Sequence, residues 1–334
     1  MFNRKIVIVA GAGASHEYGL PLGSELKAEI SKDLHFSFEH VKKIKSGSAD
    51  LISVILRHDQ SRINEYLSAG RTVAKAIPMF SSIDEALHFL SESPDSVFIG
   101  KLAIAHRIIL AERRSVLRID REYNRVKLPE QTWLSTLLSM AAAGVRKDEL
   151  HGVFQNLTII NFNYDRTIEH FLYWSLQEYA AISSETAAKI VSKINMIRPY
   201  GSLGPLEWCA MGGVSYGAEH HQLVELTKNI KTFTEQDAVD CRAAITSAIE
   251  DASVLVFLGF GFHSQNVDLL KIEKINKKVK TLATVKGIHD ENLPSMRARL
   301  TANIGVRDEH IKMLSMGASD MLRELRPMIQ TDLR

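Results

Sequence analysis

The sequence predicts an α/β protein with a parallel β-sheet and a helical insertion after the first strand. Residues 6–10 (IVIVA) form an apolar run rich in β-branched residues, which is typical of a strand buried on both faces. Further apolar runs follow at 157–160 and 254–258, and segments with helical periodicity separate them. Strands that alternate with helices in this way form parallel sheets with right-handed crossovers.

The composition is that of an ordinary globular protein. The chain has 334 residues, of which 45% are hydrophobic and 24% charged, enough for one large or two smaller domains. The net charge of +2 gives no general attraction to nucleic acid, and the longest apolar run, near 253–262, is too short to span a bilayer. Cys209 and Cys241 are the only cysteines and give no disulfide framework. Since the N-terminus also lacks a signal-peptide pattern, we expect a cytoplasmic protein with no membrane partner.

Small residues follow the first strand directly, in the sequence GAGAS at 11–15. Such residues let the backbone approach a ligand closely, and their N–H groups at a helix N-terminus suit a phosphate. The common dinucleotide fingerprint, G-x-G-x-x-G, requires glycine at position 16, where this sequence has His16. The motif predicts a phosphate-binding turn, and a tight strand–helix turn without a ligand is the alternative.

Residues 37–150 have helical periodicity and no clear β alternation. Within 81–90, Ser82 and Glu85 have the spacing of a helix capping box. The stretch from Arg113 to Lys127 is rich in basic residues, and we interpret it as a solvated helix face. An edge that docks a partner or nucleic acid is the alternative there. We prefer the first interpretation, so direct nucleic-acid binding is not indicated.

The α/β pattern resumes after the insertion. Strands are expected at 157–160, 194–198 and 254–258, with further strands near 280–285 and 310–314. Motifs rich in glycine or asparagine stand at the carboxyl ends of the first strand and of the three strands that begin at 157, 194 and 254. Because ligands bind at the carboxyl ends of parallel strands, we expect these motifs to form one shared site.

These motifs resemble those of the sirtuin-like NAD-binding proteins. GAGAS, followed by Gly19 and Pro21, resembles the first nucleotide-binding loop of that family. NFNYDRTIE (161–169) and the LGFGF…N run (258–266) are similar to two further family motifs in order and rough spacing. PYGSLG (199–204) resembles another, with one change.

The resemblance implies a Rossmann-like NAD-binding domain formed by residues 1–36 and 151–334, with 37–150 as a helical insertion. It places the pyrophosphate at the GAGAS loop and the adenine ribose at the strand end formed by 259–261. The residues that it assigns to NAD binding are Gly11, Ala12, Gly13, Ala14, Ser15, Pro21, Asn163, Asp165, Gly201, Ser202, Gly259, Phe260, Gly261 and Asn266. Gly201 and Ser202 are expected to let the chain pass close to the ligand, whereas Phe260 is equally well explained as a core residue.

Asn163 and Asp165 are candidate catalytic residues. An asparagine amide both donates and accepts, so Asn163 can hold a ribose hydroxyl or orient a water. In the family this asparagine lies beside the nicotinamide ribose, and the resemblance implies the same here. Asp165 either accepts from a ribose diol or caps the following helix, and both interpretations remain open. The alternative for the whole segment 163–165 is a plain helix cap.

Tyr200 is the third candidate catalytic residue and departs from the family pattern. Relatives commonly have a histidine at this position, which serves the reacting ribose. A phenol with a pKa near 10 is a poor general base at neutral pH, but it can hydrogen-bond a ribose hydroxyl or stack on nicotinamide. Histidines that could substitute are His16, His220, His221 and His263.

The cysteine count decides between branches of the family. The protein-deacylating sirtuins carry a four-cysteine zinc ribbon, which two isolated cysteines cannot form, so we expect no metal. The chain is instead similar to the bacterial sirtuin-like NAD hydrolases of antiphage defence. Their short forms often act beside a separate sensor or motor such as a HerA-type ATPase, so the resemblance implies a partner protein of that kind and a homo-oligomer.

We therefore expect a bacterial, cytoplasmic NAD hydrolase that uses NAD as its substrate, releases nicotinamide and ADP-ribose, and acts in antiviral defence by NAD depletion. The alternative is a non-catalytic module that binds NAD or ADP-ribose and regulates a partner. Protein deacylation is a third hypothesis, which the missing zinc cysteines disfavour.

Overall fold

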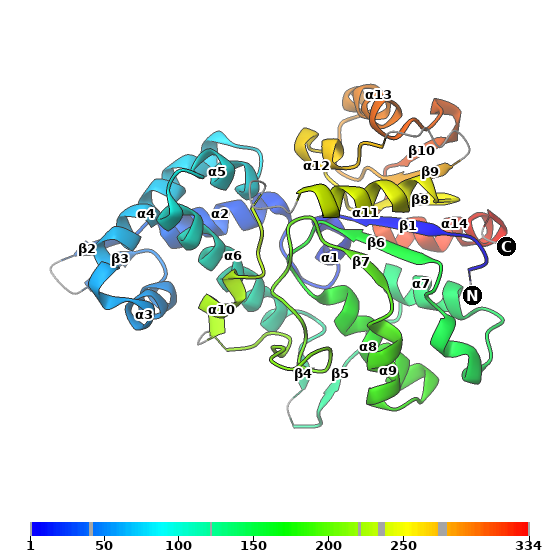
Figure 1. Ribbon diagram of the computed structural model, residues 1–334, viewed down its shortest axis with the longest axis horizontal. Coiled ribbons are helices and arrows are strands. Elements are labelled where there is room, and N and C mark those ends of the chain that lie inside the picture. The colour runs from blue at the N-terminus through cyan, green and yellow to red at the C-terminus, as the bar shows by residue number, and fades with distance from the viewer. Residues whose placement is uncertain are drawn as a thin grey trace.

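Six strands form one parallel sheet in the order β10-β9-β8-β1-β6-β7 (Figure 1). The computed structural model describes residues 2–39, 43–120, 122–219, 222–232, 238–272 and 279–332. In chain order the strands are β1 (Ile6–Ala10), β6 (Leu157–Asn161), β7 (Asn195–Ile197), β8 (Val254–Leu258), β9 (Lys280–Thr284) and β10 (Ile311–Leu314). Helices flank the sheet, so the predicted α/β, Rossmann-like fold class is confirmed.

The first strand lies at the centre of the sheet. Ile6 of β1 is opposite Leu157 of β6 on one side and opposite Val254 of β8 on the other. From β1 the chain builds one half of the sheet through β6 to β7, and then returns to build the other half from β8 to β10. The strand order therefore reverses between β1 and β8. In open α/β sheets, such a reversal marks the crevice in which ligands bind.

Two apolar clusters cover the two faces of the sheet, because successive side chains of a strand point in opposite directions. Val7 and Val9 of β1 belong to one cluster, and Ile6 and Ile8 belong to the other. The first cluster includes residues of α2 (Gly23–Leu34), α11 (Ala238–Glu250), α12 (Ser264–Leu269) and α13 (Leu293–Ile304). The second includes residues of α7 (Trp133–Ala142), α8 (Thr167–Ala180), α9 (Ser184–Val191) and α14 (Ala318–Asp332).

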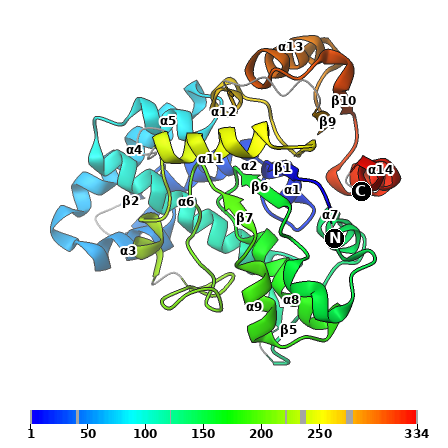
Figure 2. The ribbon, with the colours of Figure 1, turned by 45° about the vertical axis from the view of Figure 1, so that its right-hand side comes forward.

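The insertion forms a mainly helical lobe on one side of the sheet (Figure 1). Its helices are α3 (Ala49–His58), α4 (Ile63–Ala76), α5 (Ile83–Phe89) and α6 (Pro94–Arg114), with α10 (Leu223–Thr227) packed against α6. The insertion is not purely helical, because β2 (Ser37–Glu39) pairs with β3 (Lys43–Ser46) and β4 (Ile119–Asp120) with β5 (Arg125–Val126). Its last α-helix, α7, packs against α14 and α8 beside the sheet (Figure 2).

The expected helix over Arg113 to Lys127 is wrong. The helix α6 ends at Arg114, and the following residues carry the β4–β5 pair. Ser115 explains the end of the helix, because its hydroxyl accepts from the Leu117 backbone N–H at 3.0 Å and so replaces a helical hydrogen bond.

The remaining short elements are α1 (Ala12–His16) and the 3₁₀ helices η1 (Gln60–Arg62), η2 (Ile77–Met79), η3 (Lys147–Gly152), η5 (Asp290–Asn292) and η6 (Asp308–His310). Within the described ranges, no helix has both the length and the apolar character needed to cross a membrane.

Candidate functional site

A cavity of about 770 Å³ opens where the strand order reverses. It is lined by residues 11–13 after β1, 162–165 after β6 and 259–261 after β8. These are three of the motifs that the sequence predicts to share a site, and the structure brings them together at one edge of the sheet. Tyr200 and Asn266 also line this cavity, as does Pro21.

The GAGAS loop packs closely against the end of β8. The backbone N–H of Gly11 donates to the Leu258 carbonyl, and that of Gly13 to the Gly259 carbonyl, both at 3.0 Å. A Cβ on Gly11 would lie 2.6 Å from the Gly259 oxygen, so a larger residue would force the two loops apart. Two of the N–H groups expected to hold a phosphate are therefore used within the protein. The small residues allow this close contact between the two loops, whereas we expected them to allow the close approach of a ligand.

Ala14 and Ser15 do not line the cavity. Both are buried, and Ser15 connects the loop to the motif after β6. Its hydroxyl accepts from Nδ2 of Asn163 at 3.0 Å and donates to Oδ1 of Asp165 at 3.2 Å. Ser15 thus supports the two candidate catalytic side chains.

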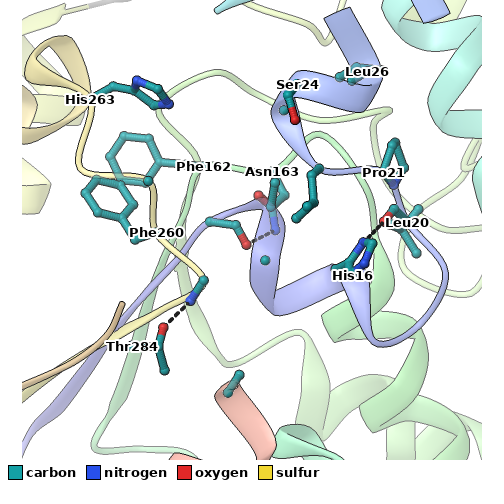
Figure 3. A pocket seen from close by; sticks show the side chains of 18 of the residues that line it. His16, Leu20, Pro21, Ser24, Leu26, Phe162, Asn163, Phe260, His263 and Thr284 are labelled. Atoms are coloured by element: carbon teal, nitrogen blue, oxygen red, sulfur yellow. Dashed lines mark hydrogen bonds between the residues drawn. The ribbon is translucent and has the colours of Figure 1, made fainter. Parts of the chain in front are cut away.

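Asn163 lies in the middle of the cavity wall, between the aromatic pair Phe162 and Phe260 and the loop that carries His16 (Figure 3). Its Nδ2 also donates to the Gly11 carbonyl at 2.9 Å, which together with the Ser15 bond fixes the orientation of the amide. No described residue donates to its Oδ1. That oxygen is therefore available to a ligand hydroxyl or a water.

Asp165 lines the cavity and also bonds to the start of the following helix. Its Oδ1 accepts from the Thr167 backbone N–H at 3.0 Å, at the start of α8. The side chain is 3% exposed, and burial raises the pKa of its carboxyl. This bond forms an Asx turn just before α8, whose N-cap residue is Arg166, and a contact of Asp165 with ribose stays a prediction.

Tyr200 lies in the cavity wall, with its ring 6.0 Å from that of Phe162. Its hydroxyl donates to Oδ1 of Asn266 at 2.7 Å. The residue is 2% exposed, and burial raises the pKa of the phenol well above its ordinary value. A phenol that is bonded and desolvated in this way holds its proton firmly. The geometry therefore favours a wall and anchoring role for Tyr200 over proton abstraction.

Gly201 and Ser202 are not brought to the cavity. Gly201 has a φ of 68° and forms a backbone bridge to Ile230. A Cβ at this position would lie 2.0 Å from the Asn229 carbonyl oxygen, so glycine is required for the packing of two chain segments. The turn positions Tyr200 and does not itself approach the cavity.

The insertion also contributes to the cavity, which was not predicted from the sequence. Ser81, Ser82 and Asp84, at the start of α5, line the cavity. The capping signal is half confirmed: the Ser82 hydroxyl accepts from the Glu85 backbone N–H at 3.1 Å, but the Glu85 carboxylate accepts from Ser81 rather than Ser82. The signal locates the start of the helix, but nothing in the local sequence shows that this start faces a site on the sheet.

Asp84 accepts a hydrogen bond from the hydroxyl of Tyr164, a residue of the loop after β6. Desolvation raises the pKa of the Asp84 carboxyl to about 6, against the Tyr164 hydrogen bond, which lowers it. The Asp84 carboxyl is therefore a stronger base than an ordinary aspartate. The same contact, together with burial, raises the pKa of the Tyr164 phenol well above its ordinary value.

Two long helices begin at the cavity. Gly23 and Ser24 at the start of α2, and Ala318 and Ser319 at the start of α14, are part of its lining. Helix N-termini carry a partial positive charge and unpaired N–H groups, which favour an anion. Lys286, just beyond β9, adds a cationic side chain at the same cavity. These features were not predicted from the sequence, because each depends on how distant helices pack.

The histidines considered as substitutes for a catalytic histidine have different positions. His16 and His263 line the cavity, and Nδ1 of His16 lies 3.1 Å from the Leu20 carbonyl (Figure 3). His220 and His221 lie outside the described residues. Among the described residues, no group of three or more His, Cys, Asp or Glu side chains has a metal-binding arrangement.

No protein-family model matches the chain, and a search of curated proteins finds no significant match. The fold and the cavity therefore define the class of this protein: a Rossmann-like α/β protein with a candidate ligand site at its topological switch point.

Proposed function

We propose that this protein is an NAD glycohydrolase, which cleaves NAD to nicotinamide and ADP-ribose. One observation carries the proposal: the cavity at the strand-order reversal exposes a fixed amide, Asn163, whose Oδ1 has no donor among the described residues. Dinucleotides bind at such reversals in doubly wound sheets. The resemblance of the loop and strand-end motifs to those of sirtuin-like proteins supports NAD in particular.

The lining fits a dinucleotide with a positively charged nicotinamide ring. The starts of α2 and α14 favour a pyrophosphate, and the aromatic side chains Phe162 and Phe260 offer apolar surface to a base. Cleavage of the nicotinamide–ribose bond passes through an oxocarbenium-like state in which the leaving group becomes neutral. Oriented oxygens such as Asn163 Oδ1 stabilise the developing positive charge and position the water.

The same resemblance supports a biological role. We propose that the protein is a bacterial, cytoplasmic effector of antiphage defence that depletes NAD. It would act as a homo-oligomer under the control of a partner protein such as a HerA-type ATPase. Genomic context is the direct test of this part: a neighbouring gene for a sensor or motor protein supports it, and a metabolic operon contradicts it.

The alternative function is a non-catalytic module that binds NAD or ADP-ribose and regulates a partner. The observation in its favour is Tyr200, because a buried phenol bonded to Asn266 replaces the histidine that relatives commonly use. Nicotinamide release from NAD, measured for the purified protein alone and with its genomic neighbour, separates the two functions. Tight NAD binding without nicotinamide release under both conditions would establish the alternative and contradict the hydrolase.

A further inference from the structure

Asp84 is the carboxylate that the insertion contributes to the described lining of the cavity. It is the second residue of α5, and its Oδ1 accepts a hydrogen bond from the Tyr164 hydroxyl. Tyr164 follows Asn163 directly, so this bond connects the insertion to the loop that carries the free amide oxygen. No other described side chain donates to the Asp84 carboxylate, which leaves Oδ2 for a group inside the cavity.

The other carboxylates in the described lining are committed to protein contacts. Glu17 accepts from the Trp133 backbone N–H at 3.0 Å through one oxygen and from Ser319 through the other. Asp165 accepts from Ser15 and from the start of α8, and Asp320 pairs with Arg323 at 2.5 Å. Asp84 and Asp320 each accept one described side-chain hydrogen bond, but the donor to Asp320 is a cationic arginine, which favours the ionised and weakly basic form, whereas the donor to Asp84 is a neutral phenol.

The surroundings of Asp84 make its carboxylate a stronger base than that of an ordinary aspartate. A carboxylate with an ordinary pKa is a weak base, whereas desolvation raises the pKa of Asp84 to about 6. Charged partners do not counteract this, because the only side chain that lowers its pKa is the Tyr164 hydroxyl. Tyr164 bonds to Asp84, and Tyr200 interacts with it electrostatically. Its neighbour in α5, Glu85, lies near His263, and Lys27 donates to the carbonyl of Phe80, four residues before Asp84.

We propose that Asp84 is the general base of the reaction and takes the proton of the water that attacks the ribose. This inference rests on the proposed NAD hydrolysis. The water oxygen forms a bond to the anomeric carbon of the ribose, and the bond from that carbon to the nicotinamide nitrogen breaks. The electron pair of the broken bond neutralises the pyridinium, and one proton of the water passes to Asp84, which later releases it to solvent. The insertion is thereby a part of the active site.

The test compares nicotinamide release by the wild-type protein, Asp84→Asn and Tyr164→Phe from pH 5 to pH 9, together with NAD affinity. We expect the wild-type kcat to fall on the acid side with a midpoint near 6, the pKa of Asp84. Asp84→Asn should lower kcat by about 100-fold or more, change KM little, and abolish the acid limb. Tyr164→Phe should move that limb to higher pH, because it removes the hydrogen bond that lowers the pKa of Asp84.

Glu92→Gln is the matched control, because Glu92 is an exposed carboxylate of the same insertion and should leave the rate and pH profile unchanged. His263→Ala tests the rival base. An active wild type with an unchanged acid limb in Asp84→Asn, or with that limb lost in His263→Ala instead, overturns the role of Asp84. If Asp84→Asn does not fold, an unshifted limb in Tyr164→Phe overturns it. A wild type that binds NAD without hydrolysing it refutes the hydrolase itself and this inference with it.

Discussion

The amide nitrogen of Asn163 lies 2.9 Å from the carbonyl oxygen of Gly11 and so joins the carboxyl ends of β6 and β1. A second bond, to the Ser15 hydroxyl, uses the other hydrogen of the same amide. One side chain of the cavity lining therefore connects the two loops, and its Oδ1 receives no hydrogen bond from a described residue. Because Asn163 both connects the loops and lines the cavity, we expect its variants to change stability as well as turnover.

We predict that Asn163→Ala abolishes NAD turnover and leaves the protein folded. Stability should fall, because two hydrogen bonds are lost at about 1 kcal/mol each. Ser15→Ala is the control: it also removes a bond to Asn163 but keeps Oδ1, so it should retain most of the turnover. Nicotinamide release and thermal unfolding are measured on both. A folded Asn163→Ala protein with wild-type turnover would show that this amide is not catalytic.

For Tyr200 we predict a graded loss. Tyr200→Phe removes one hydrogen bond, to Asn266, at a cost of about 0.5–1.5 kcal/mol or roughly tenfold in rate. Tyr200→Ala should cost much more, because the ring also packs beside Phe162. Turnover and NAD affinity are measured separately. Equal and near-complete loss of kcat in both variants, at unchanged affinity, would instead identify the phenol as an essential acid or base.

We predict that breaking a buried ion pair lowers the free energy of unfolding strongly. Arg166 and Glu112 are 1% and 0% exposed, and Nη2 of the arginine lies 2.6 Å from Oε2 of the glutamate. Arg166→Met leaves a buried carboxylate without its partner and should cost about 3–5 kcal/mol of unfolding free energy, measured with urea. The exposed pair between Arg146 and Asp148 gives the control, since Arg146→Met should cost at most about 1 kcal/mol. Similar losses in the two variants would contradict the assignment.

Asp84→Asn should stabilise the protein at alkaline pH. The pKa of Asp84 is about 6 in the folded state and 3.8 in its ordinary environment, so the folded state binds the proton more tightly than the unfolded state. The favourable contribution of the protonated carboxyl is complete below about pH 4 and is lost as the pH rises through 6. The variant should therefore gain up to about 3 kcal/mol at pH 8 and nothing near pH 4. A gain that does not depend on pH would disprove this cause.

Chelation should change neither folding nor activity. Cys209 and Cys241 are the only cysteines, and the described residues contain no metal-binding cluster. Thermal unfolding and nicotinamide release are compared before and after treatment with a metal chelator. Stoichiometric zinc in the purified protein would contradict this expectation and restore the deacylase hypothesis.

The central strands could be predicted because their burial leaves a local trace in the sequence. The expected strands at 6–10, 157–160 and 254–258 match β1, β6 and β8 closely, since strands covered on both faces are continuous apolar runs. Because these strands are parallel, their carboxyl ends lie at one edge, and Asn163, Tyr200 and Gly259 line one cavity there, as expected.

The rest of the site depends on contacts between distant segments. Asp84 reaches the cavity only because α5 packs beside the loop of Tyr164, and no local pattern encodes that packing. A Cβ at Gly201 would meet the carbonyl oxygen of Asn229, 28 residues later in the chain, so the need for glycine there is set by a distant segment. Gly11 and Gly13 are residue types found in phosphate-binding loops, but their N–H groups donate to backbone carbonyls at the end of β8.

The central position of β1 has a consequence for biosynthesis. Its two neighbours in the sheet, β6 and β8, begin at Leu157 and Val254, so a strongly apolar strand near the start of the chain waits for about 150 residues of further translation before its first partner exists. At roughly 5–20 residues per second, the wait lasts on the order of ten seconds or more. During that time β1 presents two open edges, and such edges are sites of intermolecular pairing. Nascent chains of this protein should therefore depend on chaperones until β6 has emerged from the ribosome.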